Sequence, residues 1–337
     1  MSMTMQAMVA TSLGGPEVLR RQTVPLGWPG GGRSLLVRLK AASVNPADTW
    51  FRSLGPYVKT DEPLILGHDG AGVVEAVGSE VTGFAPGDRA CFCYGGIGAT
   101  PGTYAEFAVV PEFVAARIPP EVDDRHAAAM PLVTITAWEA MHDRAQVKPD
   151  EHVLIHAGAG GTGHMAIQLA HLAGARVAAT VSTAAKAAFV RRLGAAHAIE
   201  YRAQDFVAGA LAWTHDRGLD VALDNVGPDA MQRTYRAMAP YGRIVTLMGI
   251  AADDAETTAY SRNLTLHNLM MLSPMWLGLA DRLAAQGAIL RQALALLATG
   301  RIEVHIAKTF PLPEAAAAHT FMEAGGMTGK IVLDIAG

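Results

Sequence analysis

The stretch Val153-Leu-Ile-His-Ala-Gly158-Ala-Gly160-Gly161-Thr162-Gly163 decides the fold of this chain. An apolar run typical of a buried strand leads into the spacing G-x-G-x-x-G, and a helical stretch follows from His164. The first glycine permits a tight turn, the second lets the backbone approach a pyrophosphate, and the third lets helix and strand pack closely. The helix N-terminus offers free N–H groups to phosphates. The residues expected to bind a dinucleotide here are Gly158, Gly160, Gly161, Thr162 and Gly163.

Around this turn, short apolar runs alternate with helical stretches, a pattern that predicts βαβ units and a doubly wound parallel sheet of the Rossmann type. In chain order they are Val153–Ile155, Gly163–Leu172, Val177–Val181, Ala184–Leu193, Phe206–Trp213, Val221–Leu223, Asp229–Met238 and Ile244–Leu247. Leu264–Met271 is a candidate last strand, and a long helix is expected over Ala280–Thr299. A broken helix is expected over Arg125–Ala140, because Pro131 interrupts it.

The first third of the chain predicts a separate β domain with few helices. Its strand-like segments, separated by Gly/Pro-rich turns, are Val9–Thr11, Leu35–Ala41, Gly72–Val77, Arg89–Phe92 and Tyr104–Val110. Ile302–Lys308 and Lys330–Ile335 are also strand-like, and we expect the last of them to pair with this β domain. The predicted organisation is therefore residues 1–126 with 302–337 in one domain and residues 127–301 in the dinucleotide-binding domain.

The end of the strand after the glycine turn distinguishes NAD from NADP. An Asp or Glu about 20 residues after the turn holds the ribose 2′-OH of NAD. Here the sequence is Ala178-Ala-Thr-Val-Ser182-Thr183-Ala-Ala-Lys186, which has no acid. Small hydroxyls and a lysine suit a 2′-phosphate, so the sequence predicts NADPH. The alternative is that Ser182 is an ordinary helix N-cap and Lys186 a solvated helix lysine.

Composition excludes several classes of protein. The 337 residues are 50% hydrophobic and 17% charged, with a formal net charge of -4 and no basic block, so no nucleic-acid partner is expected. No secretory signal and no membrane-spanning apolar run are evident, and we expect a cytoplasmic enzyme.

Several further motifs carry a family resemblance. In chain order they are Ala42–Arg52 (ASVNPADTWFR), Leu66–Val74 (LGHDGAGVV), Phe84–Arg89 (FAPGDR), Gly102–Glu106 (GTYAE), Thr136-Ala137, the glycine turn, Asp224–Gly227 (DNVG) and Gly329-Lys330. In these motifs the chain resembles the medium-chain dehydrogenase/reductase superfamily, which is alcohol dehydrogenase-like, and within it the zinc-free quinone oxidoreductase and zeta-crystallin branch. The resemblance implies a GroES-like β-barrel catalytic domain beside the Rossmann domain, and a homodimer or homotetramer.

The resemblance also implies roles for individual residues. Those expected to contact the cofactor, besides the glycine turn, are Asn45, Thr136, Ser182, Thr183, Lys186, Tyr201, Asn225, Leu247, Gly249 and Lys330. Asn45 also matches the catalytic-loop asparagine of the branch. The branch usually has a tyrosine where this chain has Trp50, so Tyr57 is the nearest replacement for that phenol. The candidate catalytic residues are thus Asn45, Tyr57 and Trp50.

The sequence does not predict a zinc site. A catalytic zinc needs three protein ligands. Gly67-His68-Asp69 is similar to the Gly-His-Glu segment of zinc-dependent relatives, but Asn45 stands at the first ligand position and Leu132 near the later one. His68 is expected to be a neutral imidazole, with Asp69 a possible partner. The chain's two cysteines, Cys91 and Cys93, fall short of the four ligands of a structural zinc site.

Together these features predict zinc-independent hydride transfer from NADPH to a quinone or another conjugated carbonyl. An enone or alkenal reductase would use the same fold, cofactor and residues, so this alternative stays open. A zinc-dependent alcohol dehydrogenase and a non-catalytic NADPH-binding protein are further alternatives. Metal analysis would test the first of these, and a panel of electron acceptors would test the second.

Overall fold

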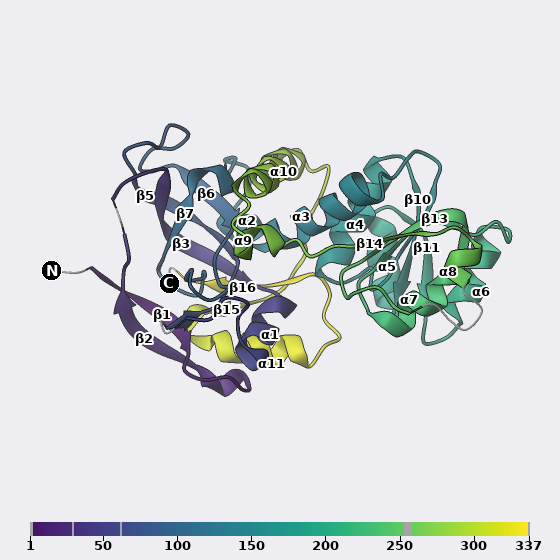
Figure 1. The fold of residues 1–337 in the computed structure, drawn as a ribbon, viewed down its shortest axis with the longest axis horizontal. Coiled ribbons are helices and arrows are strands. Elements are labelled where there is room, and N and C mark those ends of the chain that lie inside the picture. Colours follow the sequence, from purple (N-terminus) through teal and green to yellow (C-terminus); the bar gives the residue numbers. More distant parts are fainter. Residues whose placement is uncertain (1–2, 29, 61–62, 253–257, 336–337) are drawn as a thin grey trace. The chain divides into compact units, whose positions relative to one another are not determined.

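The computed structural model describes residues 3–28, 30–60, 63–252 and 258–335 (Figure 1). The chain forms two compact units: the first comprises Met1–Leu132 and Leu272–Gly337, and the second comprises Val133–Met271. The sequence predicted boundaries at 126/127 and 301/302. The chain therefore returns to the first unit before helices α9 (Ser273–Trp276) and α10 (Ala280–Ala298), which the prediction had assigned to the dinucleotide-binding domain.

Specific contacts place α10 in the first unit. Leu283 belongs to the same buried cluster as Leu35, which lies on a strand of that unit. The Nη1 atom of Arg291 donates a hydrogen bond to the carbonyl oxygen of Ala115 (3.3 Å). A Cβ atom at Gly287 would lie only 2.1 Å from the carbonyl oxygen of Phe113, so the helix approaches this backbone at a glycine. The apolar pattern of α10 shows that it packs against a core, but not against which one.

We predict that Gly287→Ala lowers the free energy of unfolding by about 1–3 kcal/mol, because the added methyl group overlaps a backbone carbonyl that cannot rotate away. The matched control is Gly209→Ala in α6, where a Cβ atom would lie 3.4 Å from the nearest side-chain atom, in Ile199. Alanine's higher helix propensity should make this control neutral or stabilising by up to about 1 kcal/mol. Chemical denaturation measures both, and equal effects would contradict the close approach.

The second unit contains the predicted Rossmann sheet. Six parallel strands run in the order β11-β10-β9-β12-β13-β14, the arrangement of two mononucleotide-binding halves. Its elements are α3 (Pro131–Trp138, which begins in the first unit), β9 (His152–Ile155), α4 (Gly161–Leu172), β10 (Arg176–Val181), α5 (Ala184–Arg192), β11 (Ala195–Glu200), α6 (Phe206–Trp213), β12 (Leu219–Asp224), α7 (Pro228–Tyr235), β13 (Met238–Thr246), α8 (Thr258–Ser261) and β14 (Thr265–Asn268). Every predicted strand and helix of this unit is present, and α2 and α3 confirm the break at Pro131. The sequence missed β11, whose alanines do not suggest a strand.

The first unit is built on two mostly antiparallel sheets, with strand orders β2-β1-β4 and β15-β16-β3-β5-β6-β8, where β7 also pairs with β3. Its elements are β1 (Thr4–Ala10), β2 (Leu19–Pro25), β3 (Ser34–Val44), α1 (Pro46–Leu54), β4 (Leu64–Ile65), β5 (Asp69–Val77), β6 (Arg89–Cys93), β7 (Phe107–Pro111), β8 (Ala115–Arg117), α2 (Asp124–Ala129), α9, α10, β15 (Ile306–Pro311), α11 (Ala315–Glu323) and β16 (Lys330–Asp334). The antiparallel pairing of β16 with β3 confirms that the C-terminal strand joins this unit. No helix among the described residues is both long and apolar enough to cross a membrane.

Candidate functional site

The glycine turn follows β9 as predicted, and the packing around it requires glycine. A Cβ atom at Gly158 would lie 2.6 Å from the side chain of Ala179, and one at Gly163 would lie 2.3 Å from the carbonyl oxygen of Ala157. Gly160 is the N-cap of α4 and offers no side chain to cap the helix. The first turn of α4 therefore presents backbone N–H groups, the arrangement that binds a pyrophosphate.

A buried carboxylate shapes the loop after β12, on the same edge of the sheet. Asp224 accepts hydrogen bonds from the backbone N–H groups of Val226 and Gly227 (3.0 Å each) and from the Thr246 hydroxyl (2.8 Å). Its backbone carbonyl accepts from the N–H of Leu247 (3.1 Å). Asp224 thus fixes this loop and the end of β13 together, and the sequence analysis had given it no role of its own.

Asn225 offers an unused acceptor beside the turn. Its Nδ2 donates to the carbonyl oxygen of His156 (2.9 Å), just before the glycines. Its Oδ1 is buried and has no hydrogen-bond partner among the described residues. A buried polar atom without a partner is costly unless a ligand supplies one. This acceptor and the glycine cradle fit a bound dinucleotide, with Leu247 and Gly249 following β13 at the same edge of the sheet.

Two cations follow neighbouring strands: Lys186 comes after β10, where NAD-binding proteins carry an acid, and Arg202 comes just after β11. The Thr183 hydroxyl accepts from the backbone N–H of Lys186 (3.3 Å), so Thr183, not Ser182, caps α5. Burial lowers the pKa of Lys186, and the nearby charge of Arg202 lowers it further. Arg202 follows Tyr201, which is exposed and bonds through its N–H to the carbonyl of Val181 (3.1 Å). Arg202 had no predicted role, because it stands just after β11, a strand that was itself not predicted.

Asn45 is buried in the first unit within a charged triad. Its Nδ2 donates to Asp69 Oδ2 (2.9 Å), and its Oδ1 accepts from Lys330 Nζ. The same ammonium donates to the Val44 carbonyl (3.3 Å) and lies 3.5 Å from Asp69 Oδ2. Burial lowers the pKa of Lys330, and the charge of Asp69 opposes this shift. The sequence assigned Lys330 to the cofactor, whereas the structure places its ammonium against Asn45 and Asp69.

Asp69 accepts two further hydrogen bonds, from the Ser43 hydroxyl (2.7 Å) and from the N–H of Leu132 (2.8 Å). Leu132 is the residue that stands near the later zinc-ligand position of the relatives. At this position the chain therefore contributes a backbone N–H that donates to Asp69, and not a side chain that could bind a metal. Among the residues that the structure describes, no group of three His, Cys, Asp or Glu side chains is placed to hold a metal ion.

A second buried carboxylate ends a directed chain of hydrogen bonds. Arg52 can only donate, so its Nη1 contact with Nδ1 of His319 (3.1 Å) leaves the proton of this imidazole on Nε2. That Nε2–H donates to the Tyr104 hydroxyl (3.0 Å), and the hydroxyl donates to Asp48 Oδ2 (3.3 Å). The same carboxylate oxygen accepts the backbone N–H of Asn45 at the start of α1 (2.7 Å). The chain therefore connects α11 to the residue that begins α1.

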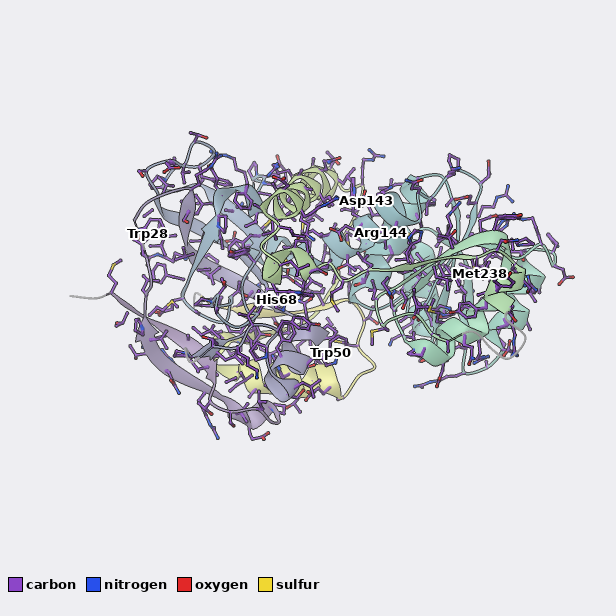
Figure 2. The ribbon with its side chains drawn as sticks, viewed as in Figure 1. Trp28, Trp50, His68, Asp143, Arg144 and Met238 are labelled. Carbon is purple, nitrogen blue, oxygen red and sulfur yellow. The ribbon has the colours of Figure 1, made fainter. Side chains whose placement is uncertain are left out.

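His68 is fully buried, and its partners differ from the one expected. Its Nδ1 lies 2.6 Å from the carbonyl oxygen of Gly95, which can only accept, so Nδ1 carries a proton. Its Nε2 lies 3.5 Å from Asp48 Oδ1. Burial raises the pKa of Asp48, and the His68 charge opposes this shift. Figure 2 labels His68. The carboxylate beside its Nε2 is that of Asp48 and not of Asp69, but it forms no hydrogen bond, so Nε2 is a buried nitrogen without a hydrogen-bond partner among the described residues.

The remaining candidates differ in exposure. Trp50, on α1, is 42% exposed, and Tyr57, in the loop after α1, is 48% exposed. Thr136 is buried in α3 of the second unit. The candidates therefore form two groups: Asn45, Trp50, Tyr57 and Lys330 lie in the first unit, and all the others lie in the second.

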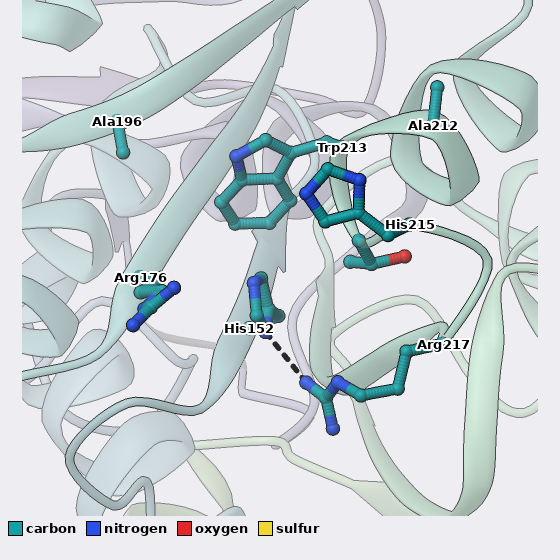
Figure 3. Close-up of a pocket in the computed structure, with 8 residues that line it drawn as sticks. His152, Arg176, Ala196, Ala212, Trp213, His215 and Arg217 are labelled. Atoms are coloured by element: carbon teal, nitrogen blue, oxygen red, sulfur yellow. Dashed lines mark hydrogen bonds between the residues drawn. The ribbon is translucent and has the colours of Figure 1, made fainter.

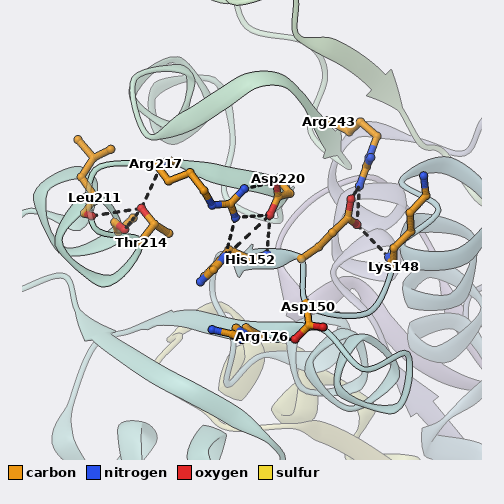
Figure 4. Close-up of polar contacts among 12 residues, drawn as sticks. Lys148, Asp150, His152, Arg176, Leu211, Thr214, Arg217, Asp220 and Arg243 are labelled. Atoms are coloured by element: carbon orange, nitrogen blue, oxygen red, sulfur yellow. Dashed lines mark hydrogen bonds and ion pairs between the residues drawn. The ribbon is translucent and has the colours of Figure 1, made fainter.

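A separate cavity of about 800 Å³ opens in the second unit, where β9 and β10 begin (Figure 3). Since the glycine turn follows the other end of β9, this cavity is not the dinucleotide cradle. Its cations already have partners. Arg217 pairs with Asp220 (2.6 Å) and donates to His152 Nδ1 (2.6 Å), and Arg176 lies 3.4 Å from Asp150 (Figure 4). These ion pairs and hydrogen bonds connect the segments at the starts of the neighbouring strands β9, β10 and β12.

Comparison with known proteins identifies the family. A model of the alcohol dehydrogenase GroES-like domain matches residues 31–120, and a model described as zinc-binding dehydrogenase matches residues 193–333. A 2-haloacrylate reductase from a Burkholderia species is 34% identical over 333 residues, which are 97% of this chain and 98% of that protein. This chain belongs to the medium-chain dehydrogenase/reductase superfamily. The predicted family, Rossmann sheet and GroES-like domain are thereby confirmed.

Other members of the superfamily narrow the branch. A quinone oxidoreductase from Pseudomonas aeruginosa is 34% identical over 320 residues, covering 95% of this chain and 96% of that protein. The crystal structure of a quinone oxidoreductase from Pseudomonas syringae superposes with a TM-score of 0.87 at 32% identity, covering 99% of this chain and all of that one. As a member of the superfamily, this chain is an oxidoreductase, and its Rossmann unit implies a nicotinamide cofactor.

Proposed function

We propose that the protein is an NADPH-dependent oxidoreductase that reduces quinones or related conjugated carbonyls. The cations beyond β10 carry this proposal. Lys186 lies in the first turn of α5, just after β10, no acid stands at the end of β10, and burial and then the charge of Arg202 lower the pKa of Lys186. Two cations whose charges act on each other, with no acid at the end of β10 itself, suit a 2′-phosphate and not a bare ribose hydroxyl.

The residues of each unit have separate tasks in this proposal. NADPH, when bound, supplies the hydride. The glycine turn and the unused Oδ1 of Asn225 hold the dinucleotide. In the first unit Asn45 has two amide hydrogens, and Asp69 accepts one of them. The other hydrogen, or the exposed phenol of Tyr57, donates to the oxygen on which negative charge develops.

Lys330 sets the direction of the Asn45 amide. An ammonium can only donate, so its contact fixes Oδ1 on the Lys330 side and Nδ2 on the other. The donor set also favours a conjugated acceptor. Asn45 and Leu132 stand where zinc-dependent relatives have ligands, and a conjugated carbonyl disperses negative charge more readily than an isolated one.

We predict that Lys186→Ala and Arg202→Ala each raise the KM for NADPH by about 10- to 100-fold and change the KM for NADH little, because a lost charged contact to phosphate costs about 1.5–3 kcal/mol. The measurement is oxidation of each nicotinamide with 1,4-benzoquinone in the presence of EDTA. Arg191→Ala, also on α5, is the matched control and should resemble the wild type.

Equal losses with NADPH and NADH would remove the 2′-phosphate from the proposal. Wild-type turnover with NADH but not with NADPH would contradict the choice of cofactor outright. Turnover that disappears in EDTA and returns with zinc would contradict the zinc-independent mechanism.

A second candidate is reduction of a conjugated carbon–carbon double bond. The observation in its favour is the 34% identity to a 2-haloacrylate reductase over nearly the whole of both chains. The proposed residues serve both reactions, since each places negative charge on a carbonyl oxygen next to Asn45 or Tyr57. Turnover of a 2-alkenal without turnover of any quinone would make this candidate the function.

A further inference from the structure

Two aromatic side chains from distant parts of the sequence meet in the first unit. The ring of Tyr57, in the loop after α1, lies 4.3 Å from the ring of Trp276 at the end of α9, tilted by 40°. Tyr57 is 48% exposed and Trp276 is only partly buried. We call this pair the aromatic shelf. Its two members are more than 200 residues apart, and no sequence pattern connects them.

The shelf is fixed on both sides. On one side, the neighbouring Met275 accepts a hydrogen bond through its sulfur from the N–H of Gly95 (3.2 Å). The carbonyl oxygen of the same Gly95 receives Nδ1 of His68 (2.6 Å). On the other side, Tyr57 packs edge-on against Phe51 at 4.9 Å, and Phe51 packs edge-on against His68 at 5.5 Å. Together these contacts lead from Trp276 and Met275 through Gly95, His68 and Phe51 back to Tyr57, so the shelf is held rigidly against the buried His68.

None of the residues joined by these contacts exposes a charged group. His68 and Phe51 are buried, and the exposed surface of the shelf is that of a phenol and an indole. Large aromatic side chains left partly exposed and held rigidly form a good surface for another flat ring, because little conformational entropy is lost on binding. The phenol hydroxyl of Tyr57 adds a hydrogen-bond donor at the edge of this surface.

We propose that the aromatic shelf is an acceptor subsite that binds planar, fused-ring substrates by stacking and makes Trp276 a determinant of specificity. This inference rests on the proposed function and names the substrate class within it. A polycyclic quinone stacks on the indole and places a carbonyl oxygen near the Tyr57 hydroxyl. A short aliphatic alkenal has no ring to stack and gains nothing from Trp276.

The test is Trp276→Leu, measured with 9,10-phenanthrenequinone and with a short 2-alkenal. Ring stacking contributes about 0.5–1.5 kcal/mol beyond the burial of area, so the KM for the quinone should rise about 3- to 10-fold or more. The kcat for the quinone, the KM for NADPH and the KM for the alkenal should change less than about twofold, because the indole packs on Tyr57 and offers these ligands only a ring face to stack on. Trp276→Phe should restore most of the quinone affinity.

A control separates this subsite from general damage. Trp28→Leu makes the same substitution at another partly buried tryptophan of the first unit and should leave all these constants unchanged. Equal changes of KM for quinone and alkenal in Trp276→Leu would overturn the proposal. Failure of Trp276→Phe to improve on Trp276→Leu would overturn it as well.

A binding measurement distinguishes failure of the subsite from failure of the proposed function. Phenanthren-9-ol has the same fused rings but is not a hydride acceptor. Isothermal titration calorimetry should show that the wild type binds it at least about threefold more tightly than Trp276→Leu does. Equal affinities, or no binding to the wild type, would overturn the shelf even if quinones turn over. Binding that depends on Trp276 without turnover of any acceptor would reject the proposed function and leave the shelf in place.

Discussion

Lys330→Met is expected to lower the free energy of unfolding by about 3–5 kcal/mol, the usual result of removing one partner of a buried charge pair. The side chains of Lys330 and Asp69 are 3% and 0% exposed, so water cannot replace the lost ammonium. Asp69 would keep its neutral donors Ser43, Asn45 and the N–H of Leu132, but it would lose the ammonium that pairs with it in the described part of the chain. Denaturant titration of the purified variant measures the effect.

Lys308→Met is the control for this prediction, because Lys308 lies on β15 of the same unit and is exposed. Its ammonium lies over the rings of Phe310 (4.5 Å) and Phe321 (5.1 Å), so its loss should cost only about 0.5–1 kcal/mol. The double variant Lys330→Met/Asp69→Asn should recover part of the loss, since it removes the uncompensated charge. If Lys330→Met were no more destabilising than Lys308→Met, the triad would have no energetic importance.

The same substitution separates stability from orientation of Asn45. Without the ammonium on Oδ1, only Asp69, which accepts from Nδ2, still orients the amide of Asn45, so its direction is held less firmly. In Lys330→Met protein that remains folded, kcat should therefore fall by a larger factor than the KM for the acceptor rises. Positioning residues act in this way, through another side chain and not by touching the substrate.

Elements with strong local signals were predictable from the sequence. The glycine turn could be predicted because only glycine fits at Gly158 and Gly163. The alternation of strands and helices predicted the Rossmann sheet. The unit to which α10 belongs was not predictable, because the apolar residues of this helix could be buried against the hydrophobic core of either unit. The contacts of Leu283, Gly287 and Arg291 with the first unit settle it.

The candidate site was predictable at the level of single residues but not of partners. Lys330 was recognised as a candidate site residue. Its contact with Asn45, however, joins residues 285 positions apart, and no local sequence pattern predicts such a contact. Arg202 was missed because its importance comes from the effect of its charge on Lys186, which stands 16 residues earlier in the chain. The shelf of Tyr57 and Trp276 was missed for the same reason.

Acidification should destabilise the first unit through His319. Burial, and then the charge of Arg52, lower the pKa of His319 from 6.5 to about 3. The unfolded chain binds a proton here below about pH 6.5 and the folded chain does not, so stability is present above this pH and is lost as the pH falls toward 3. At about 1.4 kcal/mol per pKa unit, the loss between pH 6.5 and pH 4 is on the order of 3 kcal/mol.

The physical reason is the direction of the chain of hydrogen bonds. A protonated His319 would turn an N–H toward Arg52, which can only donate, and would place two cations together. His319→Gln tests this directly, because a glutamine amide can still accept from Arg52 and donate to Tyr104 but does not titrate. Hydrogen exchange of amides in β3 and β16 reports on the first unit alone. The variant should lose less stability than the wild type between pH 6.5 and pH 4, and equal losses would show that His319 does not carry the acid sensitivity.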